Sequence, residues 1–134
     1  MNESIEVEVS IGELLDKITI LEIKMERIRQ KEKLLNIKKE LNHLRQVQVE
    51  RIPFNEEVNE LFLKLKETNE ALWDIEDEIR ECERAKDFGP QFIHLARSVY
   101  KQNDLRCHYK RELNDKLGSN LKEEKSYAEY SFNA

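Results

Sequence analysis

The pattern of apolar and polar positions predicts helices over most of the chain. Ile5, Val7 and Val9 alternate with polar residues, which is typical of a short extended segment. From residue 11 to about residue 117, apolar positions recur every three or four residues, the period of an amphipathic helix. We therefore expect an all-α protein, an antiparallel bundle of three to four long helices that follows a short N-terminal extended segment.

The first helix begins after a recognisable cap. Ser10 followed by Glu13 predicts a capping box, in which the serine hydroxyl accepts from the Glu13 amide and the carboxylate reaches back to the Ser10 amide. The helix, over about residues 11–29, mixes a wide apolar surface with charges such as Asp16 and Lys17. We expect it to be buried on more than one side, so that some of its charges pair with other side chains.

Residues 29–33 are strongly polar but contain neither glycine nor proline. One continuous helix over about 11–51 and two helices that reverse near 30–32 are both open. Every residue of the polar stretch is a good helix former, which favours continuity. A reversal, however, would place Leu21 opposite Leu41 and Ile18 opposite Leu44, so we favour a break.

Proline and glycine mark the later boundaries. Pro53 ends the helical period, and Asn55 is suited to cap the next helix, which extends to about Arg84. A turn at 87–90 then places Pro90 at the first position of the last helix. Gly118 is suited to cap the end of that helix.

Composition limits the possible classes. A chain of 134 residues is long enough for one helical domain, expected over 1–118, with a flexible, disordered tail over 119–134. A net charge of −5 argues against a general nucleic-acid binder. No stretch approaches the roughly 20 apolar residues that span a bilayer, and no signal-like leader is evident, so we expect a soluble cytoplasmic protein without membrane contact. Cys82 and Cys107 lie on different predicted helices and should be free, half-buried thiols.

Charge is distributed unevenly along the helices. Residues 55–85 contain eleven acidic and four basic residues, a balance of −7. Residues 97–116 have six basic and three acidic residues, and residues 24–51 have nine basic and four acidic residues, balances of +3 and +5. We expect the acidic helix to pack beside both basic segments, because opposite charge selects the alignment of neighbouring helices.

Polar side chains gather beside the apolar seam of the last two helices. If the chain reverses near residues 87–88, Trp73 lies opposite Asn103 and Asn69 lies opposite Arg106. Cations of the first helix, at helical spacing, add a further row if they converge on this region. The candidate cluster comprises Lys17, Lys24, Arg27, Asn69, Trp73, Glu76, Arg80, Arg97, Tyr100, Asn103 and Arg106.

Two interpretations of this cluster are open. Convergent cations beside an aromatic ring would form a pocket for an anionic small molecule. The same groups are suited to a network of salt bridges that fixes helix register, which we favour. His94 and His108 are about 21 Å apart along one predicted helix, so we expect no metal site, and nothing indicates a cofactor or identifies a catalytic residue.

Three blocks of sequence carry a resemblance to a known family. They are residues 9–28, with Ser10, Glu13 and the run from Asp16 to Lys24; residues 72–80, with Leu72-Trp73-Asp74-Ile75-Glu76-Asp77; and residues 92–106, with Leu95-Ala96-Arg97-Ser98-Val99-Tyr100 and Asn103-Asp104. Over about residues 5–117 the chain resembles a bacterial and phage family catalogued only as a domain of unknown function. The resemblance implies an all-α cytoplasmic domain and no particular activity. Members of that family often have a proline near position 31, where this chain has Lys31.

An excess of apolar positions points to association. The positions that fall off the main seams are Ile20, Ile23, Leu35, Phe62, Leu63 and Ile93. Such residues on long helices commonly meet a second chain across a two-fold axis. We expect a non-catalytic module that self-associates as a homo-oligomer, most simply a dimer, or binds another protein. The alternative is a small all-α enzyme or sensor that binds an anionic metabolite in a polar pocket between helices.

Overall fold

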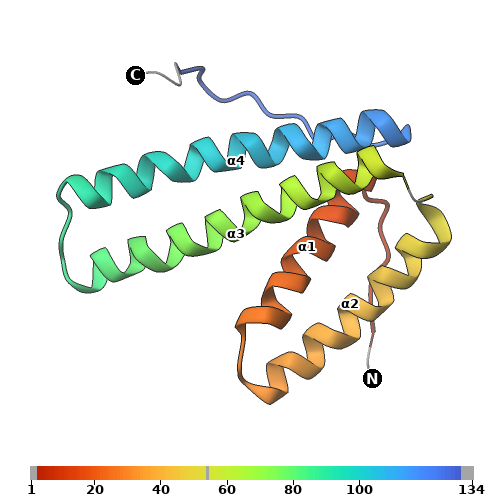
Figure 1. Ribbon diagram of the computed structural model, residues 1–134, viewed down its shortest axis with the longest axis horizontal. Helices are drawn as coiled ribbons and strands as arrows, with labels where there is room; N and C mark the ends of the chain where they lie inside the picture. The colour runs from red at the N-terminus through yellow and green to blue at the C-terminus, as the bar shows by residue number, and fades with distance from the viewer. Residues whose placement is uncertain (1–2, 54, 131–134) are drawn as a thin grey trace.

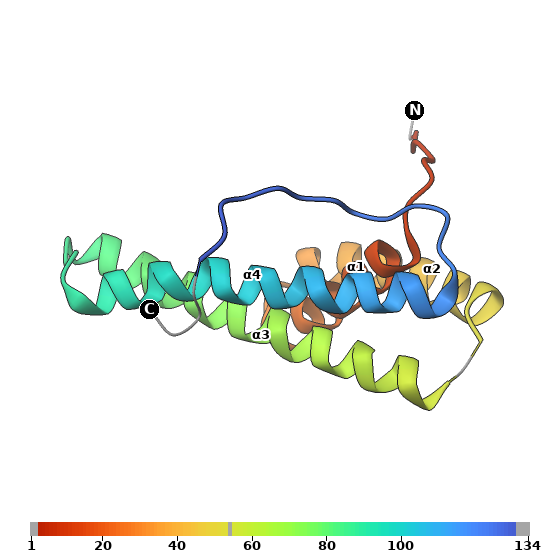
Figure 2. The same ribbon diagram turned by 90° about the horizontal axis from the view of Figure 1, so that it is seen from above.

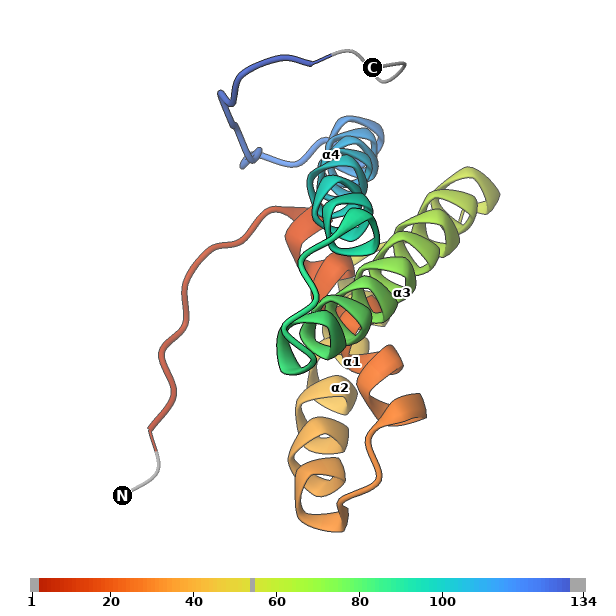
Figure 3. The ribbon, with the colours of Figure 1, turned by 90° about the vertical axis from the view of Figure 1, so that its left-hand side faces the viewer.

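The computed structural model describes residues 3–53 and 55–130 and contains four helices (Figure 1). They are α1 (Ile11–Arg27), α2 (Lys31–Arg51), α3 (Glu56–Arg84) and α4 (Pro90–Leu117). No strand occurs among the described residues, so the all-α prediction is confirmed. Residues 3–9, where the apolar positions alternate, are exposed and lead away from the helices (Figure 3).

Two antiparallel helix pairs make up the fold. α3 and α4 form a long hairpin, and the shorter α1–α2 pair crosses the half of the hairpin farther from its turn (Figures 1 and 2). Among the described residues, α1 is the helix whose backbone comes close to all three others. The half of the hairpin nearest its turn extends beyond α1 and α2 (Figure 1).

The predicted break between the first two helices is confirmed. α1 ends at Arg27, Ile28 is extended, and α2 begins at Lys31. Leu21 and Leu41 both belong to the hydrophobic core, at 5% and 3% exposure. Burial of these apolar faces outweighs the local propensity for one continuous helix.

The core lies where α1 crosses the other helices. Its buried members come from all four helices: Leu15, Ile18, Leu21, Leu41, Val58, Leu65 and Leu113. α1 contributes the most, as expected for a helix buried on more than one side. The core therefore fixes the position of α1 against α3 and α4, and with it the polar side chains that α1 carries.

Local sequence signals set the helix ends as predicted. The Ser10 hydroxyl accepts from the Glu13 amide at 3.0 Å, and Asn55 Oδ1 accepts from the Glu57 amide at 2.8 Å. The other half of the predicted capping box is wrong, because the Glu13 carboxylate accepts from Lys110 and not from the Ser10 amide. Pro90 is the first residue of α4. Gly118 caps that helix with φ 65°, a left-handed conformation that glycine adopts without strain.

The expected neighbours of the acidic helix need one correction. α3 packs along the basic α4, as predicted. Among the described residues, the basic helix α2 comes close to the backbone of α1 and not to that of α3. Its Arg45 accordingly pairs with Glu22 of α1 at 2.9 Å. Burial of the apolar face of α1 is favourable, and α2 lies where it covers that face.

Residues 119–130 have no regular secondary structure and run back along α4 (Figure 2). Ion pairs attach them to that helix: Lys122 to Asp115 at 2.8 Å, and Glu124 to Arg111 at 3.0 Å. That this segment is flexible stays a prediction. Cys82 and Cys107 are free and partly buried, as expected. None of the described helices has the length and apolarity needed to cross a membrane.

Candidate functional site

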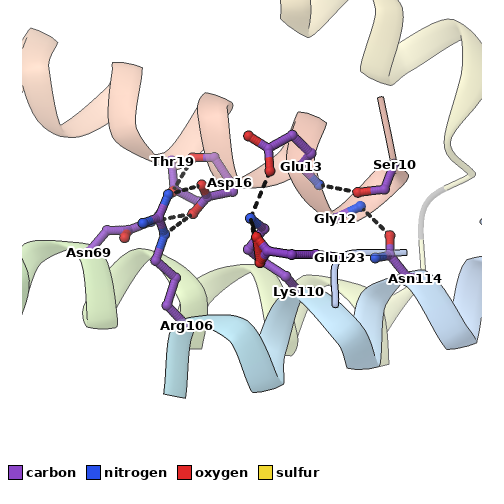
Figure 4. A network of polar contacts seen from close by, with 10 residues as sticks. All are labelled: Ser10, Gly12, Glu13, Asp16, Thr19, Asn69, Arg106, Lys110, Asn114 and Glu123. Atoms are coloured by element: carbon purple, nitrogen blue, oxygen red, sulfur yellow. Dashed lines mark hydrogen bonds and ion pairs between the residues drawn. The ribbon is translucent and has the colours of Figure 1, made fainter. Parts of the chain in front are cut away.

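A buried carboxylate lies at the centre of a polar network between α1, α3 and α4 (Figure 4). Asp16 of α1 is 1% exposed. Its two oxygens accept from Arg106 of α4, Oδ1 from Nε at 3.0 Å and Oδ2 from Nη2 at 2.5 Å. Asn69 of α3 donates to Oδ1 as well, at 2.9 Å. The hydrogen bonds that Arg106 donates to Asp16 are the main cause that raises the pKa of the Arg106 guanidinium, which therefore stays charged.

Thr19 completes this network one turn further along α1. Its hydroxyl donates to the Asp16 carbonyl at 2.7 Å and accepts from Asn69 at 2.8 Å. Thr19 and Asn69 are both buried. Among the described residues, no buried side-chain nitrogen or oxygen lacks a hydrogen-bond partner. The network is thus fully satisfied, the condition under which buried polar groups fix a single arrangement.

A second ion pair lies nearer the start of α1. Lys110 of α4 is 3% exposed, and its ammonium contacts Glu13 at 2.7 Å and Glu123 of the C-terminal segment at 3.1 Å. Burial lowers the pKa of Lys110, but the hydrogen bonds to Glu13 and Glu123 and the negative charges of Asp16 and Glu13 together outweigh burial, so the net shift is upward. Lys110 therefore remains an ammonium that joins α1, α4 and the C-terminal segment.

The beginning of α1 is bound directly to the end of α4. The Gly12 amide donates to Asn114 Oδ1 at 2.6 Å, and the Ile11 amide donates to the Ser119 hydroxyl at 3.1 Å. A Cβ at Gly12 would lie 2.5 Å from the Lys110 carbonyl oxygen. Only glycine permits this approach, so the residue without a side chain sets the distance between the two helices.

Two pockets have Arg106 in their lining. The first, of about 470 Å³, lies between α1, α3 and α4, and we name it the Trp73 pocket; it is lined by Trp73, Asn69, Glu76, Asp77, Asn103 and Arg106 with apolar neighbours. The second, of about 580 Å³, lies between α4, the start of α1 and the C-terminal segment. We name it the tail pocket, and Glu13, Lys110, Lys125 and Tyr127 belong to its lining.

The structure brings six of the eleven candidate residues to these pockets. Asn69, Trp73, Glu76, Asn103 and Arg106 line the Trp73 pocket, and Tyr100 lines the tail pocket together with Asn103 and Arg106. Asn69 and Arg106 meet at Asp16, consistent with the alignment predicted from the turn. For these two residues the contacts are those of a structural network between helices.

The other candidates line neither of the two pockets. Lys17 is exposed, 3.9 Å from Glu40 of α2. Arg27 pairs with Asp74 at 2.6 Å and lies 5.8 Å from the centre of the Trp73 ring. Arg80 pairs with Glu76 on its own helix at 3.2 Å. Lys24 and Arg97 are the remaining two candidate residues that line neither pocket. The α1 cations Lys17 and Arg27 therefore do not reach the pockets, because they lie close to carboxylates of α2 and α3.

The acceptors at the centre of the network, Asp16 and Glu13, are not among the site residues predicted from the sequence. The sequence pattern predicts Asp16 to be a charge that needs a partner and Glu13 to be a capping residue, but it pairs neither of them with Arg106 or Lys110. One signal was present, because Gly12, Asp16 and Thr19 follow the same helical period as the buried apolar residues. Polar residues within such a stripe predict a buried hydrogen-bond network.

A second surface is apolar and lies on the outer hairpin, which we define as residues 72–101 of α3, the turn and α4. Leu95 is the single buried residue in this stretch, all of which the structure describes. Phe88 and Ile93 are 49% and 55% exposed, and Phe88 packs edge-on against Phe92 with ring centres 5.2 Å apart. The further apolar residues of the outer hairpin that are only partly buried are Leu72, Trp73, Ile75, Ile79, Cys82, Ala96 and Val99.

The off-seam residues require a correction. Ile23 is 1% exposed, and Phe62 packs against the core, so neither is a free apolar residue. Ile20 lines the Trp73 pocket. Leu35, Leu63 and Ile93 are exposed as expected, at 69%, 49% and 55%. For Ile23 the reason is that α1 packs against three helices, which buries more of its circumference.

Comparison of the sequence with known families gives a match over residues 5–132. The chain belongs to DUF6165, a family of unknown function. The match to DUF6165 continues beyond the end of α4 and includes Glu123, Lys125 and Tyr127 of the tail pocket. Neither curated proteins nor solved structures gave a match. Among the described residues, no three His, Cys, Asp or Glu side chains are placed to hold a metal ion together.

Tyr130 provides a test of how the C-terminal segment lies on α4. Its hydroxyl donates to Asp104 Oδ2 at 2.5 Å, and its ring meets Tyr100 edge-on. The hydrogen bond to Asp104 is the main cause that raises the pKa of Tyr130 from 10.0 to about 12. Because the folded pKa is the higher one, this contact stabilises the attached segment below pH 10 and is lost as the pH rises through about 12.

We expect a spectrophotometric pH titration of the four tyrosines to contain one component, due to Tyr130, that loses its proton only near pH 12. We call it the late component. In the variant Tyr130→Phe the late component should be absent and the remaining components unchanged. A wild-type titration without this component would contradict the contact between Tyr130 and Asp104.

Proposed function

We propose that this protein functions by self-association, as a two-fold dimer joined through the outer hairpin. The observation that carries the proposal is the burial pattern of α3 and α4. In the inner half of the hairpin, where α1 crosses, Val58, Leu65 and Leu113 are buried. In the outer hairpin the apolar period continues, but only Leu95 is buried. A two-helix hairpin has no third element to cover its apolar side chains, and a second hairpin supplies one.

Charge supports a second copy as the partner. Residues 72–84 of α3 contain six acidic and two basic residues, a balance of −4. Residues 90–101 of α4 contain two basic and no acidic residues. A two-fold axis that runs parallel to the hairpin would place α3 of one chain beside α4 of the other, so that each acidic helix would meet a basic one. The outer hairpin is therefore complementary to itself in charge as well as in apolar surface.

The alternative of an anionic metabolite has weaker support. Two of the best-placed cations, Arg106 and Lys110, already have carboxylate partners within the chain. The Trp73 pocket has two carboxylates, Glu76 and Asp77, in its lining. An anion would therefore have to displace a carboxylate from each cation, which costs the free energy of the existing ion pair.

Ile93→Glu tests the proposed dimer. Ile93 is 55% exposed, so the substitution should leave the fold of one chain intact. In the dimer it would place a carboxylate against the acidic α3 of the partner and weaken association at least tenfold, equivalent to about 1.4 kcal/mol. The measurement is the dimer dissociation constant from sedimentation equilibrium, with circular dichroism to confirm the helical content.

The matched control is Leu35→Glu, a similar change at a 69% exposed position on α2, away from the outer hairpin. It should leave the dissociation constant unchanged. A wild-type chain that remains monomeric at high micromolar concentration would overturn the proposal. A dimer that Leu35→Glu disrupts and Ile93→Glu does not would place the interface on another surface.

A further inference from the structure

We propose that the tail pocket is a binding site for a neutral, polyhydroxylated ring molecule, that is, a carbohydrate unit. This inference is independent of the proposed self-association, because the tail pocket and the outer hairpin share only Val99 and Tyr100. At about 580 Å³, the pocket is within the range of 300–1,000 Å³ usual for small-molecule sites.

The pocket has walls from three separate parts of the chain. α4 forms one side with Asn103 and Arg106, and the start of α1 contributes Glu13. The C-terminal segment supplies the third side with Glu123, Lys125 and Tyr127. In this arrangement residues more than a hundred positions apart converge on one space, and the C-terminal segment is part of the site.

Charge in the pocket is balanced. Its lining contains three cations, Arg106, Lys110 and Lys125, and three carboxylates, Glu13, Asp104 and Glu123. Each cation is already close to a carboxylate: Lys110 lies 2.7 Å from Glu13, Lys125 lies 3.5 Å from Asp104, and Arg106 pairs with Asp16. An ion of either sign would leave one pocket charge without its partner, a change that is costly for groups as buried as Lys110.

Hydroxyl groups can join such paired charges without separating them. A hydroxyl accepts from an ammonium or guanidinium and donates to a carboxylate at the same time. A zwitterion has its two charges on fixed atoms, and it would require a free cation and a free carboxylate at matching positions. The cations and carboxylates of the tail pocket lie side by side, so they favour a molecule that carries several hydroxyl groups.

Aromatic rings give the pocket a surface for the apolar face of a ring. Tyr100 and Tyr127 are 43% and 80% exposed while they line the space. The Lys125 ammonium lies 5.5 Å from the centre of the Tyr127 ring, which holds the two side chains near one another. A sugar ring presents C–H groups on its faces and hydroxyls around its edge, and this combination of surfaces matches the lining.

The test is a titration of the whole 134-residue chain with sugar derivatives, in which binding is monitored through amide chemical shifts in NMR. The probes are the methyl glycosides of glucose, galactose, mannose and N-acetylglucosamine, each to 200 mM. We expect at least one to give saturable shifts centred on Tyr100, Asn103 and Tyr127. Citrate, inorganic phosphate and glutamine at the same concentrations should give no saturable shift there.

Two variants separate the pocket from general effects on the C-terminal segment. Tyr127→Ala should weaken binding of the responding glycoside at least tenfold, because it removes a ring from the lining. Leu121→Ala changes an apolar residue of the same segment that does not line the pocket, and binding should persist. Ile93→Glu should also retain binding, so failure of the dimer proposal and failure of this one are distinguishable.

The inference is overturned if none of the glycosides saturates a response at the pocket. Saturation by citrate or phosphate alone would show an anion site, and saturation by glutamine alone a zwitterion site. Equal weakening by Tyr127→Ala and Leu121→Ala would show that the C-terminal segment as a whole, and not the pocket lining, determines binding.

Discussion

Replacement of Asp16 by alanine is expected to lower the free energy of unfolding by about 3 kcal/mol. Asp16 is 1% exposed and accepts two hydrogen bonds from Arg106 and one from Asn69. Without the carboxylate, the Asn69 amide loses an acceptor in a buried position, and Arg106 becomes a half-buried cation without its counter-charge. Removal of one partner of a buried pair costs much more than the net contribution of the pair.

The measurement is urea unfolding monitored by circular dichroism. Arg106→Ala and the double variant with both substitutions complete a double-mutant cycle. The double variant should lose less than the sum of the two single changes, since it leaves no unpaired charge. Lys17→Ala, one position along the chain, removes an exposed charge 3.9 Å from Glu40 and should cost less than about 0.5 kcal/mol. A loss for Asp16→Ala as small as that for Lys17→Ala would show that the network contributes little to the fold.

Gly12→Ala is expected to destabilise the protein by about 2 kcal/mol, although helix propensity alone predicts a gain of up to about 1 kcal/mol. The new methyl group would lie 2.5 Å from the Lys110 carbonyl oxygen, and that oxygen belongs to the rigid backbone of α4. The helices must separate to admit it, which also stretches the 2.6 Å hydrogen bond from the Gly12 amide to Asn114. Overpacking and a lost buried hydrogen bond therefore outweigh propensity.

Thermal and urea unfolding of Gly12→Ala and Gly89→Ala would show whether helix propensity or overpacking dominates at Gly12. At Gly89 the nearest atom to an added Cβ is the Asp87 side-chain oxygen at 3.2 Å, which can rotate away. Gly89→Ala should therefore change the free energy of unfolding by less than about 1 kcal/mol. If Gly12→Ala is instead more stable than the wild type, the close approach of α1 and α4 is contradicted.

The boundaries of the helices could be predicted because their causes are local. Ser10 and Asn55 cap helices through amides two or three residues away, and Pro90 and Gly118 act through their own backbone angles. Chemistry confined to a few neighbouring residues is fully present in the sequence. The same holds for the helical period itself, which predicted the extent of α3 and α4.

The break between α1 and α2 could be predicted only in part from local signals. Residues 29–33 carry no local signal that ends a helix, and the decision came from burial of Leu21 and Leu41 in the common core. The sequence supplied the matching apolar positions, and packing chose between the two arrangements that they allowed.

By itself, then, the sequence determined an all-α fold, the ends of its helices, and the presence of charges on α1 that require partners. Only the tertiary structure decided the partners. Arg106 reaches Asp16 across 90 positions of the chain, and Glu123 reaches Lys110 from a segment without any periodic pattern. The physical reason is that contacts between helices depend on crossing angle and register, and these follow from the packing of the whole core.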